Sequence, residues 1–231
     1  MLVQLPVAGR PGALPVLVAL YRRPEWARAH GTRHKTPAQL TRLLLARLVR
    51  GVPARQCIIG GDTGYGTSET ARWWGKPRRH LTLGCTVYRD AAVYEPPPPR
   101  PRPTRGRPRV TGQHLASPQA VVAQTPQRLR LTVTWDGGGT RALAVVTGTG
   151  HWSRSGEDLV AVRWVSVPAG TGTQRDEDVL TTDITMPPPQ RVEYETQRWA
   201  LETTCHACRE DLPLESTKGS CQATVLRRTP G

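Results

Sequence analysis

The chain has 231 residues, of which 37% are apolar, seven are Trp and none is Phe. This length suits one large domain or two small ones, and the composition is that of a globular protein. The net charge of +14 favours a polyanionic partner such as nucleic acid, and the lack of any run of about 20 apolar residues excludes a membrane-spanning protein.

Two features of the composition qualify these conclusions. Nearly all the positive charge is Arg, with Lys only at Lys35, Lys76 and Lys218. A GC-rich genome would also favour Arg over Lys, so charge alone does not prove nucleic-acid binding. Five Cys is an odd number, and no export signal frames the N-terminal apolar run, so we expect reduced thiols and a cytoplasmic location.

The first 94 residues follow the pattern of an α/β unit. The continuous apolar run at 13–20 predicts a buried strand. Thr36 and Pro37 predict a helix start, because Thr can cap a helix and Pro suits its first position, and the helix should end before Pro53. A strand at 56–60, a helix at 67–74 and a strand at 81–88 follow, and together they indicate a sheet with both faces covered.

The composition changes at Glu95, where a Pro- and Arg-rich arm begins. Such a segment is typical of extended chain rather than a core element. Beyond it, short alternating runs broken by Gly clusters predict a small antiparallel sheet. The predicted strands are 128–134, 142–147, 159–167 and 179–183, and a long helix is expected at 190–211.

Asp62 is the first candidate catalytic residue. It follows the strand at 56–60 and begins the glycine-rich turn Gly61-Asp-Thr-Gly-Tyr-Gly66. Side chains at the carboxyl ends of strands point into the crevice where α/β proteins place their sites. The alternative is that Asp62 only caps the next helix or stabilises its own turn.

The C-terminal helix supplies the second candidate group. At 100° per residue, Arg198, Glu202, Cys205 and Arg209 share one stripe. A carboxylate between two cations suits a phosphate-handling site, in which the acid holds a hard divalent ion and the arginines bind DNA oxygens. The alternative is an exposed helix with ordinary i,i+4 pairs.

These residues resemble a known family. The segment Tyr194-Glu-Thr-Gln-Arg-Trp-Ala-Leu-Glu202, with Arg209 seven residues later, resembles the C-terminal signature of DDE-type insertion-element transposases of the β-insert group. That signature is Tyr, two residues, Arg, three residues, Glu, six residues, Lys; here Tyr194 lies one place early and Arg209 replaces Lys. The resemblance also covers, in the family's order, Arg33-His-Lys-Thr36, Asp62-Thr-Gly-Tyr65, Gly106-Arg-Pro-Arg109 and Thr181-Thr-Asp183.

The resemblance implies a ribonuclease-H-like α/β fold, in which a mixed sheet with helices is interrupted by an antiparallel β-rich insertion. Residues 1–94 would form the first part of the core, 95–183 the basic arm and insertion, and 184–231 the C-terminal core helix and tail. Asp62 and Glu202 would be metal ligands for Mg²⁺, and Arg198 and Arg209 would orient phosphate oxygens during phosphodiester hydrolysis and strand transfer. The partners would be DNA and, as an oligomer, full-length transposase, in the nucleoid of a bacterial cytoplasm.

The family's first catalytic Asp has no counterpart here. It would lie on a strand upstream of 13–20, and residues 1–12 contain no acid. We therefore expect an N-terminally truncated fragment that cannot cleave DNA alone. A non-catalytic DNA-binding remnant that interferes with intact transposase remains an alternative.

Two further groups of residues allow predictions. The arm should contact DNA phosphates, although a solvated linker is the alternative reading; its arginines are Arg100, Arg102, Arg105, Arg107 and Arg109. Cys205, His206 and Cys208, with Cys221, form a less favoured zinc-binding alternative, since residues in mid-helix more often pack than bind metal.

Overall fold

The computed structural model describes most of the chain up to residue 198 and four positions beyond it. The described residues are 2–7, 10–15, 17, 19–53, 55–75, 81–99, 106, 109–135, 139–153, 159–170, 175–198, 202, 203, 206 and 210. The chain divides into two compact units. The first comprises Met1–Leu48, Asp136–Gly138 and Thr196–Gly231, and the second comprises Val49–Trp135 and Gly139–Glu195.

The first unit begins with an antiparallel hairpin of β1 (Leu2–Val7) and β2 (Arg10–Pro15). The prediction of one buried strand at 13–20 is therefore wrong. β2 ends at Pro15, whose ring nitrogen cannot donate a ladder hydrogen bond, and Leu20 is 42% exposed. The apolar run gave no sign that its first half pairs locally with β1.

Two helices follow the hairpin, α1 (Pro24–Ala29) and α2 (Pro37–Gly51). α2 confirms the predicted helix start. The Gln39 backbone N–H donates to Thr36 Oγ1 at 3.3 Å, and the Thr36 N–H donates to Gln39 Oε1 at 3.0 Å. This reciprocal capping box satisfies two backbone donors, and Pro37 occupies the first helical position, where no N–H is needed.

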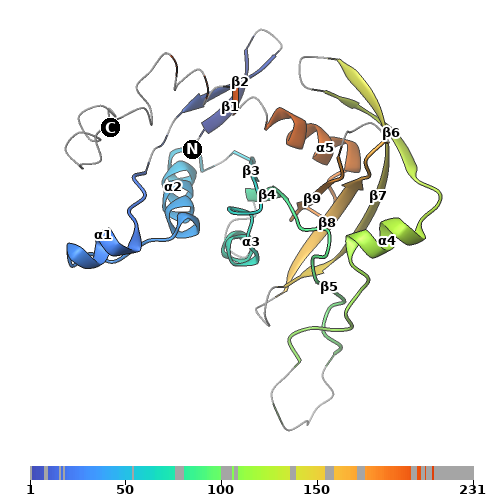
Figure 1. Cartoon of the computed structure of the whole chain (residues 1–231), viewed down its shortest axis with the longest axis horizontal. Helices are drawn as coiled ribbons and strands as arrows, with labels where there is room; N and C mark the ends of the chain where they lie inside the picture. Colours follow the sequence, from blue (N-terminus) through green and yellow to red (C-terminus); the bar gives the residue numbers. More distant parts are fainter. Residues whose placement is uncertain are drawn as a thin grey trace. The chain divides into compact units, whose positions relative to one another are not determined.

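The second unit is built on a seven-stranded mixed sheet (Figure 1). A parallel pair lies at one edge, and the remaining strands continue from it in antiparallel pairing. The sheet order is β3 (Cys57–Gly61), β4 (Leu81–Thr86), β9 (Glu177–Thr181), β8 (Val160–Val167), β7 (Thr140–Trp152) and β5 (Val93–Tyr94), with β6 (Leu129–Thr134) paired to β7. The described part of the chain thus has a mixed α/β fold with this sheet and five helices.

Most predicted elements are present with shifted ends. α3 (Ser68–Gly75), β3, β4 and the four strands β6 to β9 match predictions. Sequence reasoning missed β1, α1, β5 and α4 (Pro118–Gln124). α4 carried a usable signal, because Ser117 caps it by accepting from the Ala120 N–H at 3.3 Å and Pro118 opens it.

The structure describes only part of the predicted last helix and does not assign the fold to a family. α5 is described over Pro188–Gln197, and the predicted extension to residue 211 falls largely outside the described residues. β9, assigned from sequence to the insertion, pairs directly with β4. The ribonuclease-H-like assignment and the boundaries 1–94, 95–183 and 184–231 remain predictions.

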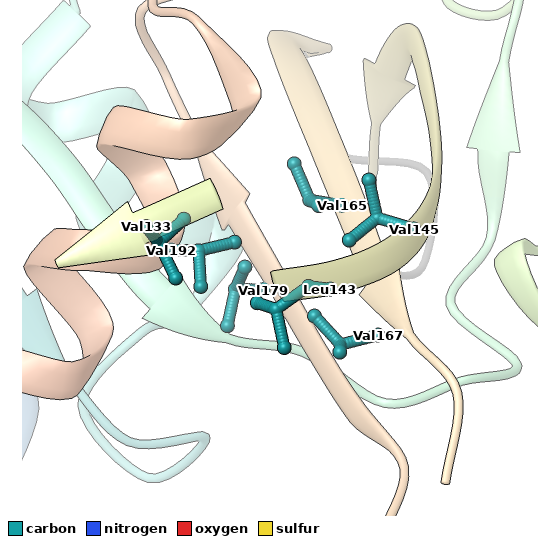
Figure 2. Packing of buried hydrophobic residues seen from close by; sticks show 7 residues of the cluster. All are labelled: Val133, Leu143, Val145, Val165, Val167, Val179 and Val192. Carbon is teal, nitrogen blue, oxygen red and sulfur yellow. The ribbon is translucent and has the colours of Figure 1, made fainter. Parts of the chain in front are cut away.

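The core of the second unit is a cluster dominated by valine (Figure 2). Valine packs well on a pleated surface. Val192 of α5 packs against the strand residues and completes the cluster. On β7, Val145 belongs to the cluster, whereas its neighbour Val146 is also buried but points to the opposite face. Both sheet faces are therefore covered at this point. The cluster comprises Val133, Leu143, Val145, Val165, Val167, Val179 and Val192.

β3 differs from its prediction as a buried strand. It is the first strand in the sheet order, so only one of its edges pairs among the described strands. Its residues alternate between half-buried and exposed, and Ile58 is 40% exposed. A continuous apolar run cannot reveal whether a strand is central or at an edge.

Candidate functional site

Asp62 lies directly after β3 and organises the turn that follows. Its Oδ1 accepts hydrogen bonds from the backbone N–H groups of Gly64 at 2.9 Å and Tyr65 at 3.2 Å. The Asp62 carbonyl accepts from the Gly66 N–H at 2.8 Å. The turn-stabilising reading from sequence is thus observed. Asp62 is nevertheless exposed, and its Oδ2 makes no hydrogen bond within the described residues, so a fixed carboxylate oxygen remains available.

The glycine-rich turn rests against β4. A Cβ added to Gly66 would lie 2.3 Å from the Cβ of Cys85, so only glycine allows this approach. The Cys85 thiol is fully buried. Burial raises its pKa to about 12; the Arg191 charge opposes the shift, and the charges of Glu195 and Asp62 add to it. Cys85 is therefore a protonated packing residue, and both acids lie within electrostatic range of it.

Arg191 and Glu195 of α5 form a buried ion pair that sequence reasoning missed. Arg191 is 2% exposed and Glu195 is 6% exposed. Arg191 Nη2 donates to Glu195 Oε2 at 2.9 Å and to the Cys85 carbonyl at 3.2 Å, and its Nε donates to the Leu180 carbonyl at 2.7 Å. Gly84 makes room for the guanidinium, since a Cβ there would lie 3.3 Å from Arg191 Cζ. The pair fixes α5 to β4 and β9.

The predicted residues of the C-terminal stripe lie in the first unit. Arg198 Nη1 is 3.0 Å from Glu202 Oε1, and the Glu202 side chain is 53% exposed. This is the i,i+4 pair that the alternative reading expected. Arg209 lies outside the described residues. Asp62 belongs to the second unit, so the meeting of Asp62 and Glu202 remains a prediction.

The metal-binding predictions remain untested. Within the described residues there is no group of three or more His, Cys, Asp or Glu side chains that could hold a metal ion. Cys205, Cys208 and Cys221 of the zinc alternative lie outside the described residues, so that alternative stays a hypothesis.

A pocket of about 240 Å³ lies at the carboxyl ends of β3 and β4. Its wall includes Thr63 beside Asp62, the start of α3, and Asp90 and Trp152. Thr67 caps α3, since its Oγ1 accepts from the Thr70 N–H at 3.1 Å. Among the described residues, no Lys or Arg lines this pocket.

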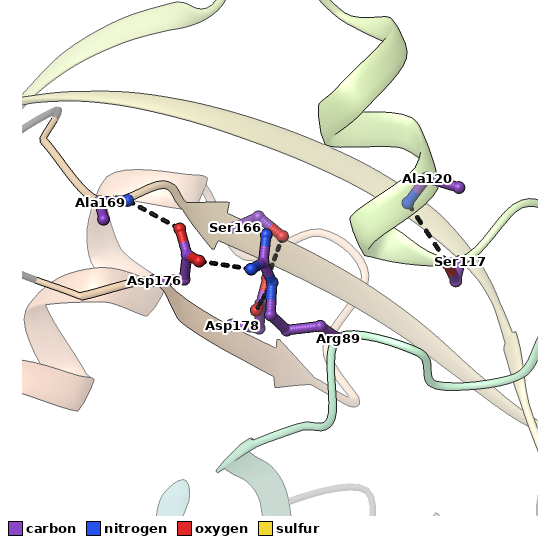
Figure 3. Close-up of polar contacts among 7 residues, drawn as sticks. All are labelled: Arg89, Ser117, Ala120, Ser166, Ala169, Asp176 and Asp178. Atoms are coloured by element: carbon purple, nitrogen blue, oxygen red, sulfur yellow. Dashed lines mark hydrogen bonds and ion pairs between the residues drawn. The ribbon is translucent and has the colours of Figure 1, made fainter.

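An ion-pair network holds the segment after β4, which forms part of the pocket wall (Figure 3). Arg89 pairs with Asp176 through Nη1, and its Nε lies 3.2 Å from Asp178 Oδ2 without the alignment of a hydrogen bond. Asp178 also accepts a short hydrogen bond from Ser166. Burial raises the pKa of Asp178 above its ordinary value; the Ser166 hydrogen bond and the Arg89 charge oppose the shift, and the nearby Asp176 adds to it.

Backbone hydrogen bonds join the described residues at the two ends of the basic arm. Glu95 N–H donates to the Gln113 carbonyl at 2.9 Å, and Gly112 N–H donates to the Glu95 carbonyl at 3.0 Å. A Cβ on Gly112 would lie 2.3 Å from the Pro96 carbonyl oxygen, so glycine allows this close crossing. Arg109 is exposed near one end. The other four predicted DNA-binding arginines lie outside the described residues and are Arg100, Arg102, Arg105 and Arg107.

Comparisons with known proteins give a distant structural likeness. Neither the protein-family models nor the curated proteins match the chain. Among solved structures, the piggyBac transposase in a synaptic complex with hairpin DNA is similar at 15% identity and a TM-score of 0.35, over 76% of this chain and 28% of that chain. The chain thus spans less than a third of that protein. The likeness is too weak to support a conclusion about fold or function. Among the described helices, none has the length and apolar character needed to cross a membrane.

Proposed function

We propose that this chain is a DNA-binding protein of the DDE-type insertion-element transposase group that cannot cleave DNA alone. The observation that carries the proposal is Asp62. Two backbone N–H groups hold its Oδ1, and its other oxygen stays open at the end of β3, beside the parallel strand β4. Carboxylates at this edge of an α/β sheet are placed to act on a ligand.

The proposed metal is Mg²⁺, held by Asp62 and Glu202. Carboxylate oxygens are the hard ligands that Mg²⁺ prefers, and Asp62 has an oxygen free for this role. When bound, the metal would activate the attacking oxygen and stabilise the leaving oxygen of a phosphodiester. Arg198 and Arg209 would hold phosphate oxygens nearby. Two carboxylates are too few for a two-metal site of the three-carboxylate type, which is why we expect no cleavage by this chain.

DNA is the proposed partner because of the charge of +14 and the Arg-rich sequence of the arm between Glu95 and Gly112. If its five arginines each neutralise one phosphate, binding should depend on salt with a slope of about −4.5, from roughly 0.9 per phosphate. A DNA partner would place the chain in the bacterial nucleoid. The chain could also assemble with full-length transposase and interfere with it.

Two measurements test the proposal on the full chain. Fluorescence anisotropy with labelled duplex DNA at several salt concentrations should show binding, and changing the five arginines of the arm to Gln should nearly remove the salt slope. Absence of DNA binding at low salt would overturn the proposal. A supercoiled plasmid incubated with Mg²⁺ should stay intact, and nicking that Asp62→Ala abolishes would refute the expected incompetence.

A further inference from the structure

A second basic surface lies around α1, in the first unit. Residues 21–35 contain five cationic side chains and one acid, Glu25. That acid is paired with Arg28 at 3.5 Å. Three other cationic residues are exposed, and their side chains form no hydrogen bond or ion pair within the described residues. They are Arg23, Arg33 and Lys35. The surface therefore presents uncompensated positive charge.

Planar side chains form a column on the same segment. The Arg22 guanidinium carbon lies 4.1 Å from the centroid of the Trp26 ring. The His30 ring stacks on Trp26 with centroids 3.9 Å apart and an interplanar angle of 12°. Two groups this close to one ring cannot share a face, so Arg22 and His30 cover opposite faces of the indole. Because His30 is exposed, its outer face is open to another planar ring.

Local hydrogen bonds hold this column in place. His30 Nδ1 lies 2.9 Å from the Trp26 carbonyl oxygen, which fixes the imidazole. α1 ends in a Schellman motif, in which the Thr32 N–H donates to the Ala27 carbonyl at 2.9 Å and Gly31 adopts φ of 59°. The stacking surface is therefore organised before any ligand binds, which lowers the entropy lost on binding.

We propose that residues 21–35 bind single-stranded DNA, with an unpaired base stacked on His30 and phosphates bound by Arg23, Arg33 and Lys35. An aromatic platform beside cations is the combination that single-strand binding uses, because every base has a π-face and every nucleotide a phosphate. This inference rests on the proposed DNA-binding function and adds a surface outside the Arg-rich arm.

The first test compares single-stranded and duplex oligonucleotides in binding to the full chain. His30→Ala should weaken single-strand binding on the order of tenfold, as expected for loss of one base stack, and leave duplex binding within about twofold. Thermal unfolding of the variant should match the parent chain, since His30 is exposed. Equal loss for both oligonucleotides would overturn the stacking role.

The second test uses a matched pair of charge variants. Arg33→Gln/Lys35→Gln should reduce the single-strand salt slope by about 1.4, from roughly 0.7 per phosphate. The control Arg128→Gln/Arg130→Gln removes the same charge from two exposed arginines of the second unit that have no partner within the described residues. It should leave the slope unchanged. Equal changes in both variants would show only a general effect of net charge.

The outcomes separate this inference from the proposed function. If the chain binds neither single-stranded nor duplex DNA, the proposed function fails. If it binds DNA but His30→Ala and Arg33→Gln/Lys35→Gln behave like the control, only the α1 surface is refuted. If those variants instead lose binding to phosphatidylserine vesicles while DNA binding is retained, the surface binds anionic lipid and the inference is overturned.

Discussion

The chain contains two Arg-x-x-x-Glu pairs seven residues apart, which share their spacing and contact distance but differ in burial. Arg191 and Glu195 are almost fully buried, and Arg191 also binds the carbonyls of Leu180 and Cys85. Arg198 and Glu202 are linked by a similar contact of 3.0 Å, but the Glu202 side chain is 53% exposed. The seven-residue offset is close to two helical turns. Helical periodicity therefore predicts the same helix face for both pairs and cannot distinguish them.

The difference teaches that the surroundings, not the spacing, decide what such a pair does. A buried ion pair must compensate the loss of hydration through extra hydrogen bonds, as Arg191 does. An exposed i,i+4 pair keeps its hydration and contributes little to stability. A structural role therefore fits the first pair, whereas the carboxylate of the second pair is exposed and accessible to a ligand.

Glu195→Gln should produce the largest effect on stability. It leaves the Arg191 guanidinium buried without its counter-charge, which costs about 3–5 kcal/mol of the free energy of unfolding. Urea denaturation followed by circular dichroism would measure it. The double variant Arg191→Met/Glu195→Leu removes both charges and should recover a large part of the loss. A loss below about 1 kcal/mol for Glu195→Gln would contradict the structural role.

Asp178 should give a smaller, pH-dependent effect, because its cation Arg89 is about one-third exposed. Burial raises the pKa of Asp178 in the folded state. The folded chain then holds a proton that the unfolded chain releases, so this group's stabilising contribution is present at low pH and is lost as pH rises through the folded pKa. Asp178→Asn does not titrate, and its unfolding free energy should fall less over that range. Asp176→Asn leaves Asp178 ionisable and should retain most of the fall, because burial, the largest cause of the raised pKa, is unchanged.

The parts of the fold that followed from sequence are those fixed by local chemistry. Thr36 and Pro37 predicted the start of α2 correctly, and the structure adds Gln39 as the partner of Thr36 in a capping box. Ser117 and Pro118 give a similar signal for α4, which sequence reasoning overlooked. Alternating patterns located β6, β7 and β8 for the same reason, since the period of two belongs to the strand itself.

The parts that could not be predicted depend on long-range packing. The apolar run at 13–20 is divided because β2 pairs with β1 and ends at Pro15. Ile58 is exposed because β3 lies at a sheet edge. For the candidate site, sequence placed Asp62 at the end of a strand but ranked Glu202 without considering Glu195 as an acid of the site. Burial of the first pair depends on contacts of Arg191 with Leu180 on β9 and with Cys85 on β4, and Cys85 is 106 residues away in sequence.

Glu202→Gln should have the smallest effect on stability and is the variant that best separates the two pairs. Losing an exposed i,i+4 pair costs about 0.3–0.5 kcal/mol. Glu25→Gln is its matched control, because Glu25 is also exposed and paired with an Arg on its own helix. If Glu202 is a Mg²⁺ ligand, Glu202→Gln should also reduce the rise in unfolding temperature that millimolar Mg²⁺ produces, whereas Glu25→Gln should not. A large loss of stability with no change in the Mg²⁺ response would assign Glu202 the structural role that we give to Glu195, and Asp62 would then be left without its proposed partner.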